Sequence, residues 1–413
     1  MTSAPREVDH LLIGGGLATA SCAQTLREEG ADGSILVVGR ELDPPYNRPA
    51  LSKGYLQGKD DRESGLVHPS GWWEEQAVEL LTRTSVMKLD PAERVAKLSN
   101  KEEVRFGSAL IATGAIVRRL RAEGGDLEGV HYLRAFGNAD AIRTDAEQAS
   151  RVVLVGGSYI GCEVAASLTT AFGCECTVLM QEKVNFERQF GSEVGAFFSG
   201  LLAEHGVTVH ASDELDRFEG TDGRVSRVVT KAGAELDCDC VVIGAGVMPD
   251  VMLARAAGLE LGESGGVKCS SRLETSAPGV YAAGDMCEWE SPLFGRQMRV
   301  EHWDVAKEHG KTAALNMLGR DVPHEALPYF FSDLADWASM EYVGSGSGEP
   351  VIRGSLESGE FTAFYLGEGG TVTGALTVGR SEELEDARSL IAEQSTPDTA
   401  LLADPGSALA GSS

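Results

Sequence analysis

Short apolar runs that stop at glycine recur along this chain of 413 residues. The first run, at residues 10–13, stops at the glycines 14–16. A helical stretch then reaches residue 29, and a second apolar run follows at 35–38. Runs of this length, rich in Leu, Ile and Val, are typical of buried strands. The pattern predicts strand, glycine turn, helix and strand, which is the first unit of an α/β nucleotide-binding fold.

The same order of elements recurs in the middle of the chain. An apolar run at 151–155 meets Gly156 and Gly157, a helix is expected to reach residue 171, and a strand is expected at 176–180. Three further apolar runs end in turns that contain glycine, at 113–114, 244–246 and 284–285. We therefore expect two dinucleotide-binding units in one chain, with buried parallel strands that meet their ligands at these turns.

The pattern changes after Gly319 to shorter alternating segments, such as 360–365 and 370–376, which are typical of antiparallel strands. A helix is expected at 381–394. The last stretch lacks periodicity and predicts a disordered tail. The predicted fold is α/β, with two Rossmann-like domains and a smaller α+β domain. The expected bounds are 1–117 with 245–322 for the first domain, 118–244 for the second, 323–394 for the third and 395–413 for the tail.

Charge and composition exclude several classes of protein. Lys and Arg number 36 against 63 Asp and Glu, so the net charge is −27, which disfavours nucleic-acid binding. The apolar runs are far shorter than the ~20 residues that cross a bilayer. Residues 1–9 lack the basic region of an export signal, and eight cysteines are too few for a disulfide scaffold. We expect a soluble, cytoplasmic protein with reduced cysteines and no membrane partner.

The glycine turns carry the first chemical signal. Glycine between a strand and a helix lets the backbone approach a pyrophosphate, whose charge the helix N-terminus stabilises. Gly14 and Gly16 suit this role, but Thr19 stands at the third glycine position, and Ser158 replaces the middle glycine of the second unit. Either copy alone is also compatible with a tight turn that binds nothing. Two correctly placed copies favour two dinucleotide sites.

An acidic residue that bonds a ribose hydroxyl is expected about 20 residues after the glycines. Glu41 lies slightly late for this role in the first unit. In the second unit residues 180–183 read Met-Gln-Glu-Lys, so Glu182 is the candidate, beside a lysine. Both NADH and NADPH stay open as the donor, with NADH the preferred prediction.

Taken together, the motifs resemble the FAD-dependent pyridine nucleotide-disulfide oxidoreductases. Within them the chain is similar to the ferredoxin/rubredoxin reductase branch, which includes putidaredoxin reductase. The resemblance covers residues 8 to 376 and implies a glutathione-reductase-like architecture, with FAD in the first domain and NAD(P)H in the second. The segments that carry it are 13–18, 45–53, 112–114, 156–163, 279–285 and 300–303.

The resemblance also implies which residues hold the two nucleotides. The first glycine turn would hold the FAD pyrophosphate, Asp285 the ribityl and phosphate end, and the Ala-Thr-Gly segment the adenine side. The residues implied for FAD are Gly14, Gly16, Leu17, Ala18, Glu41, Arg48, Lys53, Ala112, Thr113, Gly114, Arg118, Gly284, Asp285, Glu301, His302 and Trp303. Those implied for NAD(P)H are Gly156, Gly157, Ser158, Tyr159, Ile160, Gly161, Glu163, Glu182, Gly244 and Gly246.

Three of these positions are implied in catalysis, namely Lys53, Glu163 and Trp303. Lys53 would lie beside the isoalloxazine ring and pair with Glu163, and a cation there favours the anionic reduced flavin. The alternative is a surface ion pair worth ~0 to 1 kcal/mol. Trp303 would pack against the flavin, and we prefer packing to an electron relay. His302 is either a flavin neighbour or a satisfied histidine at a helix start.

A candidate docking patch for an acidic iron–sulfur ferredoxin follows the last of these motifs. Lys307 and Lys311 are four residues apart, so they share one face of the expected helix, and Arg320 lies nearby. The alternative is an ordinary solvated helix face. The expected oligomeric state is a monomer or a homodimer.

The cysteines exclude thiol relay. Segment 44–53, where disulfide reductases of this architecture carry a redox pair, contains no cysteine, and the sequence has no C-x-x-C. The C-x-C pairs at 174/176 and 238/240 are compatible with metal ligands. We prefer the interpretation that these cysteines are buried as small apolar residues, and we predict no metal. Residues 328–333 lack the family's Trp-rich stretch, and 116–117 lack its Arg-Pro pair, so flavin access and part of the FAD site are expected to differ.

These observations lead to one hypothesis and its rivals. We expect an electron-transfer flavoenzyme in which NAD(P)H gives a hydride to FAD, and single electrons pass to a ferredoxin that serves a monooxygenase or dioxygenase. The rivals of the same class are a rubredoxin reductase and an NAD(P)H oxidase that acts on oxygen or quinones. The rival of another class is a nucleotide-sensing flavoprotein like apoptosis-inducing factor.

Overall fold

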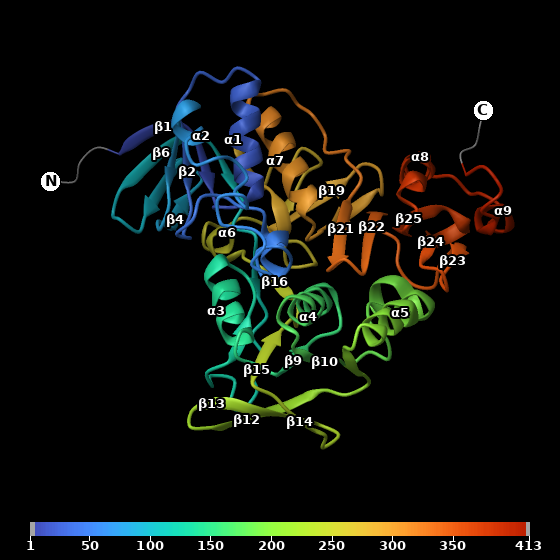
Figure 1. The fold of residues 1–413 in the computed structure, drawn as a ribbon. Coiled ribbons are helices and arrows are strands. Elements are labelled where there is room, and N and C mark those ends of the chain that lie inside the picture. Colours follow the sequence, from blue (N-terminus) through green and yellow to red (C-terminus); the bar gives the residue numbers. More distant parts are fainter. Residues whose placement is uncertain (1–4, 410–413) are drawn as a thin grey trace. The chain divides into compact units, whose positions relative to one another are not determined.

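The computed structural model describes residues 5–409 (Figure 1). The contacts between its residues divide the chain into two compact units. Unit 1 comprises Met1–Asn47, Glu63–Ile116 and Val247–Pro328, and unit 2 comprises Arg48–Arg62, Val117–Gly246 and Tyr329–Ser413. Each unit contains a parallel sheet, and unit 2 also contains an antiparallel C-terminal sheet. The predicted fold class is thereby confirmed, while the three-domain bounds stay a prediction.

The main sheet of unit 1 has a parallel centre, and Ile13 at the end of its first strand faces Val38 and Ile111. Because these strand ends are level, the turns that follow them lie at one edge. The neighbouring strands β4 and β5 are antiparallel. The strands are β3 (Val78–Leu81), β2 (Ile35–Val38), β1 (Arg6–Ile13), β6 (Glu103–Ile111), β5 (Val95–Leu98) and β4 (Val86–Asp90), with β18 (Val280–Ala282) paired to β6.

Two helices of unit 1 lie side by side, α1 (Leu17–Glu28) and α7 (Trp303–Met317) (Figure 1). A Cβ at Gly310 would lie 2.3 Å from the carbonyl oxygen of Ala18, so glycine allows the helices to come this close. The other elements of the unit are α2 (Trp72–Glu75), α6 (Met252–Ala256), η2 (Gly284–Met286), β16 (Val247–Pro249), β17 (Val267–Cys269), β19 (Cys287–Ser291) and β20 (Arg296–Met298). The short strand β7 (Ala115–Val117) begins in unit 1, and its last residue is assigned to unit 2.

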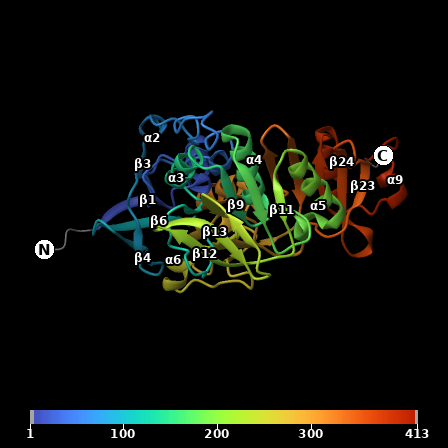
Figure 2. The ribbon, with the colours of Figure 1, turned by 60° about the horizontal axis from the view of Figure 1, so that its bottom comes forward.

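The parallel sheet of unit 2 repeats the strand, glycine turn and helix order, and Figure 2 shows α4 beside β9. Its strands are β11 (Thr208–His210), β10 (Glu175–Leu179), β9 (Arg151–Val155), β15 (Cys240–Ile243) and β8 (Val130–Tyr132). The helices are η1 (Arg48–Ser52), α3 (Phe136–Ala146), α4 (Tyr159–Phe172) and α5 (Glu187–Glu204), and an antiparallel sheet is formed by β12 (Leu215–Thr221), β13 (Arg224–Thr230) and β14 (Glu235–Asp237).

The C-terminal part of unit 2 is an antiparallel sheet with short helices. Helix α8 buries Leu384, Ala387 and Leu390, which recur every three residues and therefore share one face. In sheet order the strands are β21 (Tyr329–Leu334), β22 (Ala338–Gly344), β25 (Val372–Val378), β24 (Glu360–Leu366) and β23 (Val351–Ser355), with η3 (Glu368–Gly370), η4 (Ser381–Glu383), α8 (Leu384–Ala392) and α9 (Thr399–Ala403).

The expected disordered tail from residue 395 is wrong for residues 395–409. This segment forms α9, and Leu402 is 2% exposed. The buried guanidinium of Arg353 donates to the carbonyl oxygens of Asp404 and Ser407, the second at 2.7 Å. A buried arginine on β23 therefore orders a segment whose composition alone suggests disorder. Residues 410–413 of the predicted tail lie outside the described residues.

The eight cysteines all lie in the described part of the chain, and all are free and buried. Cys22 and Cys162 occupy helix cores, and the two C-x-C pairs are also inside unit 2, as small apolar residues would be. Among residues 5–409, each helix is too short or too polar to cross a membrane.

Candidate functional site

The first glycine turn, in unit 1, is shaped for close approach of backbone. Gly14 has φ +133°, and a Cβ there would lie 2.1 Å from the carbonyl oxygen of Ala112. Gly16 is the N-cap of α1, and among the described residues a Cβ on it would meet no atom within 4 Å. Leu17 and Ala18 begin the helix. The turn therefore presents open space to the N-terminal N–H groups of α1, which suits an anion.

Thr113, in the segment after β6, is fixed by a bond to the chain that returns from unit 2. Its hydroxyl donates to the carbonyl oxygen of Asp250 at 2.6 Å, and the N–H of Asp250 donates to the carbonyl oxygen of Gly114 at 2.8 Å. The Asp250 carboxylate also pairs with Arg40 at 2.9 Å. The Ala112-Thr113-Gly114 segment thus lies at the same sheet edge as Gly14.

The expected ribose carboxylate of the first unit already has a partner. Glu41 accepts a hydrogen bond from the hydroxyl of Tyr46 at 2.5 Å, so one of its oxygens is engaged. Arg48, expected near the flavin, belongs to unit 2 and donates to the carbonyl oxygen of Arg134 at 2.5 Å. Arg118, also in unit 2, donates its backbone N–H to the carbonyl oxygen of Gly246 at 3.0 Å.

The turn at Gly284 and Asp285 is held by two residues that the sequence reasoning missed. The N–H of Gly284 donates to Nδ1 of the buried His309 at 3.3 Å, and burial holds the pKa of His309 well below its usual value, so the ring is neutral and can accept. Arg299 donates to the carbonyl oxygen of Asp285 at 3.0 Å and pairs with Glu301 at 2.5 Å. The one sequence signal for His309 is its position two helical turns after His302.

The helix-start aromatic pair lies beside these residues in unit 1. Burial lowers the pKa of His302 to about 4, so this ring is also neutral. The indole N–H of Trp303 donates to Oδ1 of Asn47 at 2.9 Å. Trp303 is therefore tied to the Pro-Tyr-Asn-Arg segment that carries part of the family resemblance.

The second glycine turn, in unit 2, is tighter than the first. A Cβ on Gly156 would lie 2.4 Å from the carbonyl oxygen of Gly244, and a Cβ on Gly161 would lie 1.9 Å from the carbonyl oxygen of Gly156. A Cβ on Gly157 would lie 2.1 Å from the sulfur of Met180. Gly156 also has φ +122°. At Gly156 and Gly161 a Cβ would meet backbone, so a side chain there requires movement of the turn, whereas at Gly157 the side chain of Met180 would have to move.

The residues around this turn are placed mainly by packing. Ser158 is the N-cap of α4, Tyr159 packs against the rings of Phe186 and Phe330, and Ile160 is 38% exposed. Gly246 has φ +84° and open space around its Cα among the described residues.

Two side chains that follow β10 have partners within unit 2. The Glu182 carboxylate pairs with Arg188 at 2.7 Å. Asn185, which the sequence reasoning missed, is fully buried and donates its amide to the Gly157 oxygen at 3.2 Å. Because Asn185 stands in a charged stretch, its sequence gives no signal of this role.

The expected ion pair between Lys53 and Glu163 is present within unit 2, with Nζ to Oε1 at 2.5 Å. Glu163 is 5% exposed, so this is not the surface pair considered as the alternative. Its carboxylate also accepts hydrogen bonds from the hydroxyls of Ser52 and Ser332, both at 2.5 Å. The Nζ of Lys53 lies 5.9 Å from the ring centre of Phe331.

The candidate docking cations in unit 1 are largely paired with acidic neighbours. Lys311 pairs with Glu308 at 2.6 Å, and Arg320 pairs with Glu29 at 3.3 Å. The Nζ of Lys307 lies 5.4 Å from the ring centre of Trp303. The patch is therefore less positive than the three cations alone suggest, and Lys307 contributes most of its charge.

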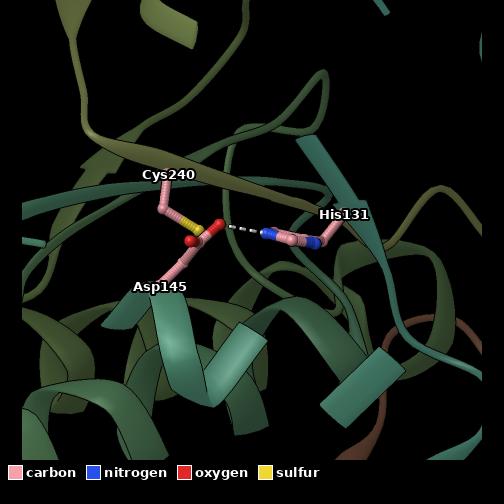
Figure 3. Close-up of side chains that lie close together, drawn as sticks. All are labelled: His131, Asp145 and Cys240. Atoms are coloured by element: carbon pink, nitrogen blue, oxygen red, sulfur yellow. Dashed lines mark hydrogen bonds and ion pairs between the residues drawn. The ribbon is translucent and has the colours of Figure 1, made fainter. Parts of the chain in front are cut away.

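One group of described side chains offers nitrogen, oxygen and sulfur donors close together, namely His131, Asp145 and Cys240 (Figure 3). The imidazole already bonds the Asp145 carboxylate at 2.6 Å, and the second oxygen of Asp145 binds Arg224 at 2.7 Å. A guanidinium at this position repels a metal cation. The hydrogen bond from His131 and the ion pair with Arg224 meet at Asp145 and tie α3 to β8 and β13.

Comparison with known proteins matches this arrangement. The pyridine nucleotide-disulphide oxidoreductase family model matches residues 8–310, and the reductase C-terminal model matches residues 329–412. The ferredoxin–NAD(+) reductase component of an anthranilate 1,2-dioxygenase system from Burkholderia cepacia is 33% identical over 400 residues, which cover 96% of this chain and 97% of that protein.

Two further relatives bear on the acceptor. Monodehydroascorbate reductase 5 of Oryza sativa subsp. japonica is 31% identical over 95% of this chain and 84% of its own length. The reductase in a crystal structure of the covalent putidaredoxin reductase–putidaredoxin complex is 31% identical, with a TM-score of 0.92 over 97% of both chains.

Proposed function

Because the chain belongs to the pyridine nucleotide-disulphide oxidoreductase family, in its ferredoxin reductase branch, we propose that it is an FAD-dependent NAD(P)H–ferredoxin reductase. The observation that carries the proposal is the presence of two glycine cradles and a buried Lys53–Glu163 pair in a chain without a C-x-x-C sequence. Such a chain has two nucleotide sites and no dithiol to relay electrons.

The residues of unit 1 fit FAD. The open space at Gly16 and the close approach at Gly14 suit a pyrophosphate, and Asp285 is fixed by Arg299 on the turn that would meet the ribityl chain. Bound FAD supplies the conversion of a two-electron donor into single electrons. The protein orients it through Gly14, Gly16, Thr113, Asp285, Glu301, His302 and Trp303.

The residues of unit 2 fit NAD(P)H. Gly156, Gly157 and Gly161 form the cradle, and Ser158 begins the helix whose N-terminus would face the phosphates. The carboxylate of Glu182 lies just after β10, where a ribose hydroxyl would bind, and it disfavours the extra phosphate of NADPH. NADH is therefore the proposed donor, although the Arg188 partner of Glu182 moderates this preference.

The Lys53–Glu163 pair is proposed to tune hydride acceptance. A lysine ammonium beside the flavin stabilises the negative charge that develops on reduction. Glu163 holds that ammonium in place and limits its net charge. Trp303 is proposed to pack against the flavin.

The proposed acceptor is a ferredoxin that serves a monooxygenase or dioxygenase, since the relatives named above include the reductase of a dioxygenase system and one captured with putidaredoxin. A second candidate is direct reduction of a small organic radical, which the similarity to a monodehydroascorbate reductase favours. Rubredoxin, oxygen and a nucleotide-sensing role are the remaining alternatives.

An anaerobic stopped-flow experiment tests this function. The purified protein is mixed with NADH or NADPH, the flavin absorbance is followed, and the reduced protein is then mixed with a [2Fe–2S] ferredoxin or with monodehydroascorbate. We expect rapid bleaching with NADH, slower bleaching with NADPH and fast reoxidation by the ferredoxin. Sluggish bleaching with both nucleotides would favour the sensing role, and purification without flavin would refute the proposal.

A further inference from the structure

The buried carboxylate of Glu163 binds three donors that come from distant parts of the sequence. Lys53 and Ser332 both bond Oε1, and Ser52 bonds Oε2, each at 2.5 Å. Ser52 and Ser332 are each 1% exposed. With the ion pair alone, the carboxylate could still rotate about its side-chain bonds. The two hydroxyl groups, which come from distant parts of the sequence, fix both oxygens.

Each serine is itself held by its surroundings. Ser167, one helical turn after Glu163 on α4, donates its hydroxyl to the carbonyl oxygen of Ser52 at 2.7 Å, and Gln57 donates to that hydroxyl at 3.0 Å. Ser332 lies within β21, opposite Met340 of β22. The two hydroxyls therefore approach Glu163 from rigid segments of the backbone.

We propose that Ser332 and Ser52 are positioning residues that fix the Glu163 carboxylate and thereby set the position of the Lys53 ammonium for hydride transfer. The hydroxyls are neutral, so they orient the carboxylate without cancelling its charge. Lys53 is the charged partner, and its side chain is only 16% exposed. This inference rests on the proposed function of the Lys53–Glu163 pair. It gives Ser332 of β21 a role in the site that Glu163 of α4 and Ser52 of η1 also form.

The consequence is electrostatic. In a site of low dielectric constant the effect of a charge on a reacting group depends steeply on distance, so a small displacement of an ammonium changes the barrier. Without the Ser332 hydroxyl, Oε1 keeps Lys53 as its partner but loses the bond that fixes its direction. We expect Ser332→Ala to slow flavin reduction by NADH roughly 5- to 30-fold, the range that one lost buried hydrogen bond produces.

The test compares Ser332→Ala with Ser339→Ala, which removes an exposed hydroxyl from the same β21–β22 hairpin, where it bonds Asp333 at 2.7 Å. Three quantities are measured: the rate constant of flavin reduction, the midpoint potential of the bound flavin, and acetylation of Lys53 by mass spectrometry. The last does not require the flavin. Ser332→Thr retains a hydroxyl and should restore all three. If Ser332→Ala unfolds, Ser332→Cys keeps the volume without a strong donor.

A double-mutant cycle separates positioning from a structural effect. If Ser332 acts through Glu163, Ser332→Ala slows reduction and raises Lys53 acetylation in the native background, and has no further effect on top of Glu163→Gln. The inference would be overturned if Ser332→Ala and Ser339→Ala had equal rates of flavin reduction and equal Lys53 acetylation. It would also be overturned if the effect of Ser332→Ala on the reduction rate added fully to that of Glu163→Gln. If Glu163→Gln and Lys53→Met themselves leave reduction unchanged, the proposed function of the pair fails instead, and the inference fails with it.

Discussion

Trp303 and Asn47 are joined by a hydrogen bond of 2.9 Å between two motifs of unit 1 that are 256 residues apart in the sequence. The indole also faces the ammonium of Lys307, at 5.4 Å from its ring centre. Asn47 is itself fixed by its backbone N–H, which donates to the carbonyl oxygen of Gly65 at 2.8 Å. An indole held at both its edge and its face has the environment of a packing residue.

This relationship predicts the behaviour of Trp303→Phe. An aromatic ring stays, but the indole N–H and the second ring of the indole are lost, so we expect a loss of about 1 to 2 kcal/mol in the free energy of unfolding and a change of only a few-fold in the rate of ferredoxin reduction. Asn47→Ala should have a similar effect on stability, and the double variant should lose little more. Denaturant unfolding and single-turnover kinetics measure both quantities. Trp337→Phe, which removes an indole from unit 2, is the control.

The alternative role of Trp303 gives a different result. If the indole relays electrons, Trp303→Phe should slow ferredoxin reduction by more than 100-fold while Asn47→Ala has little effect on that rate. Such a difference would contradict packing.

Gly161→Ala should damage the second nucleotide site. Its Cβ would lie 1.9 Å from the carbonyl oxygen of Gly156, so α4 must move away from the turn. We expect a destabilisation of about 1 to 3 kcal/mol and at least a ten-fold rise in the Kd for NADH, with FAD still bound. Isothermal titration with NADH and thermal unfolding measure these effects.

Gly200→Ala is the matched control for this variant. Gly200 lies within α5 of the same unit, and among the described residues a Cβ there would meet no atom within 4 Å. Because alanine favours helices over glycine by up to ~1 kcal/mol, we expect equal or greater stability and unchanged NADH affinity. An NADH affinity for Gly161→Ala equal to that of Gly200→Ala would show that the cradle does not bind the nucleotide.

The parts of the fold that follow from local chemistry could be predicted from the sequence. Gly14 and Gly156 stand at positive φ between a strand and a helix, and only such turns let the backbone come so close to Ala112 and Gly244. The fully apolar run Ile35–Val38 is buried along its whole length, as a central parallel strand requires. Periodicity and glycine chemistry are sufficient for elements of this kind.

The parts that depend on distant contacts could not be predicted. Ser332 meets Glu163 across 169 residues, and Arg353 orders the segment near Asp404 across 51 residues. The composition of that segment predicts disorder because it contains no information about Arg353, which lies elsewhere in the sequence and binds the backbone of the segment. The docking cations show the same limit, since the partner of Arg320 is Glu29, 291 residues away.

Charge at Lys307 is predicted to control association with a ferredoxin. Lys311 and Arg320 are already paired, so Lys307→Glu should remove most of the local positive potential and slow ferredoxin reduction roughly ten-fold at low salt. Stopped-flow rates at several salt concentrations measure this. Lys88→Glu, on the exposed side of β4, changes the net charge equally and is the control.

The salt dependence decides between the local patch and the net charge of −27. If the patch dominates, the rate for the native protein falls as salt rises; if overall repulsion of an acidic ferredoxin dominates, the rate rises instead. A rising rate, together with equal effects of Lys307→Glu and Lys88→Glu, would exclude docking at this helix.

The buried network around Glu383 predicts an acid-sensitive step in the stability of unit 2. Burial raises the pKa of this carboxyl, but hydrogen bonds from Arg380, Arg353 and Thr362 outweigh burial and lower the pKa to about 2. The folded pKa lies below the unfolded value near 4.5, so the network stabilises fully above pH 4.5 and loses its contribution as the pH falls toward 2. Thermal unfolding across this range should show the loss.

Glu383→Gln tests the origin of that loss. The variant leaves the buried guanidinium of Arg353 without its charged partner, so we expect a destabilisation on the order of 3 kcal/mol at pH 7 and a weaker dependence of stability on pH between 4.5 and 2. Because Arg353 also holds the segment after α9, proteolysis should begin there first. Glu385→Gln, an exposed carboxyl two residues away, should change neither property. A pH dependence that survives in Glu383→Gln would place the acid-sensitive group elsewhere.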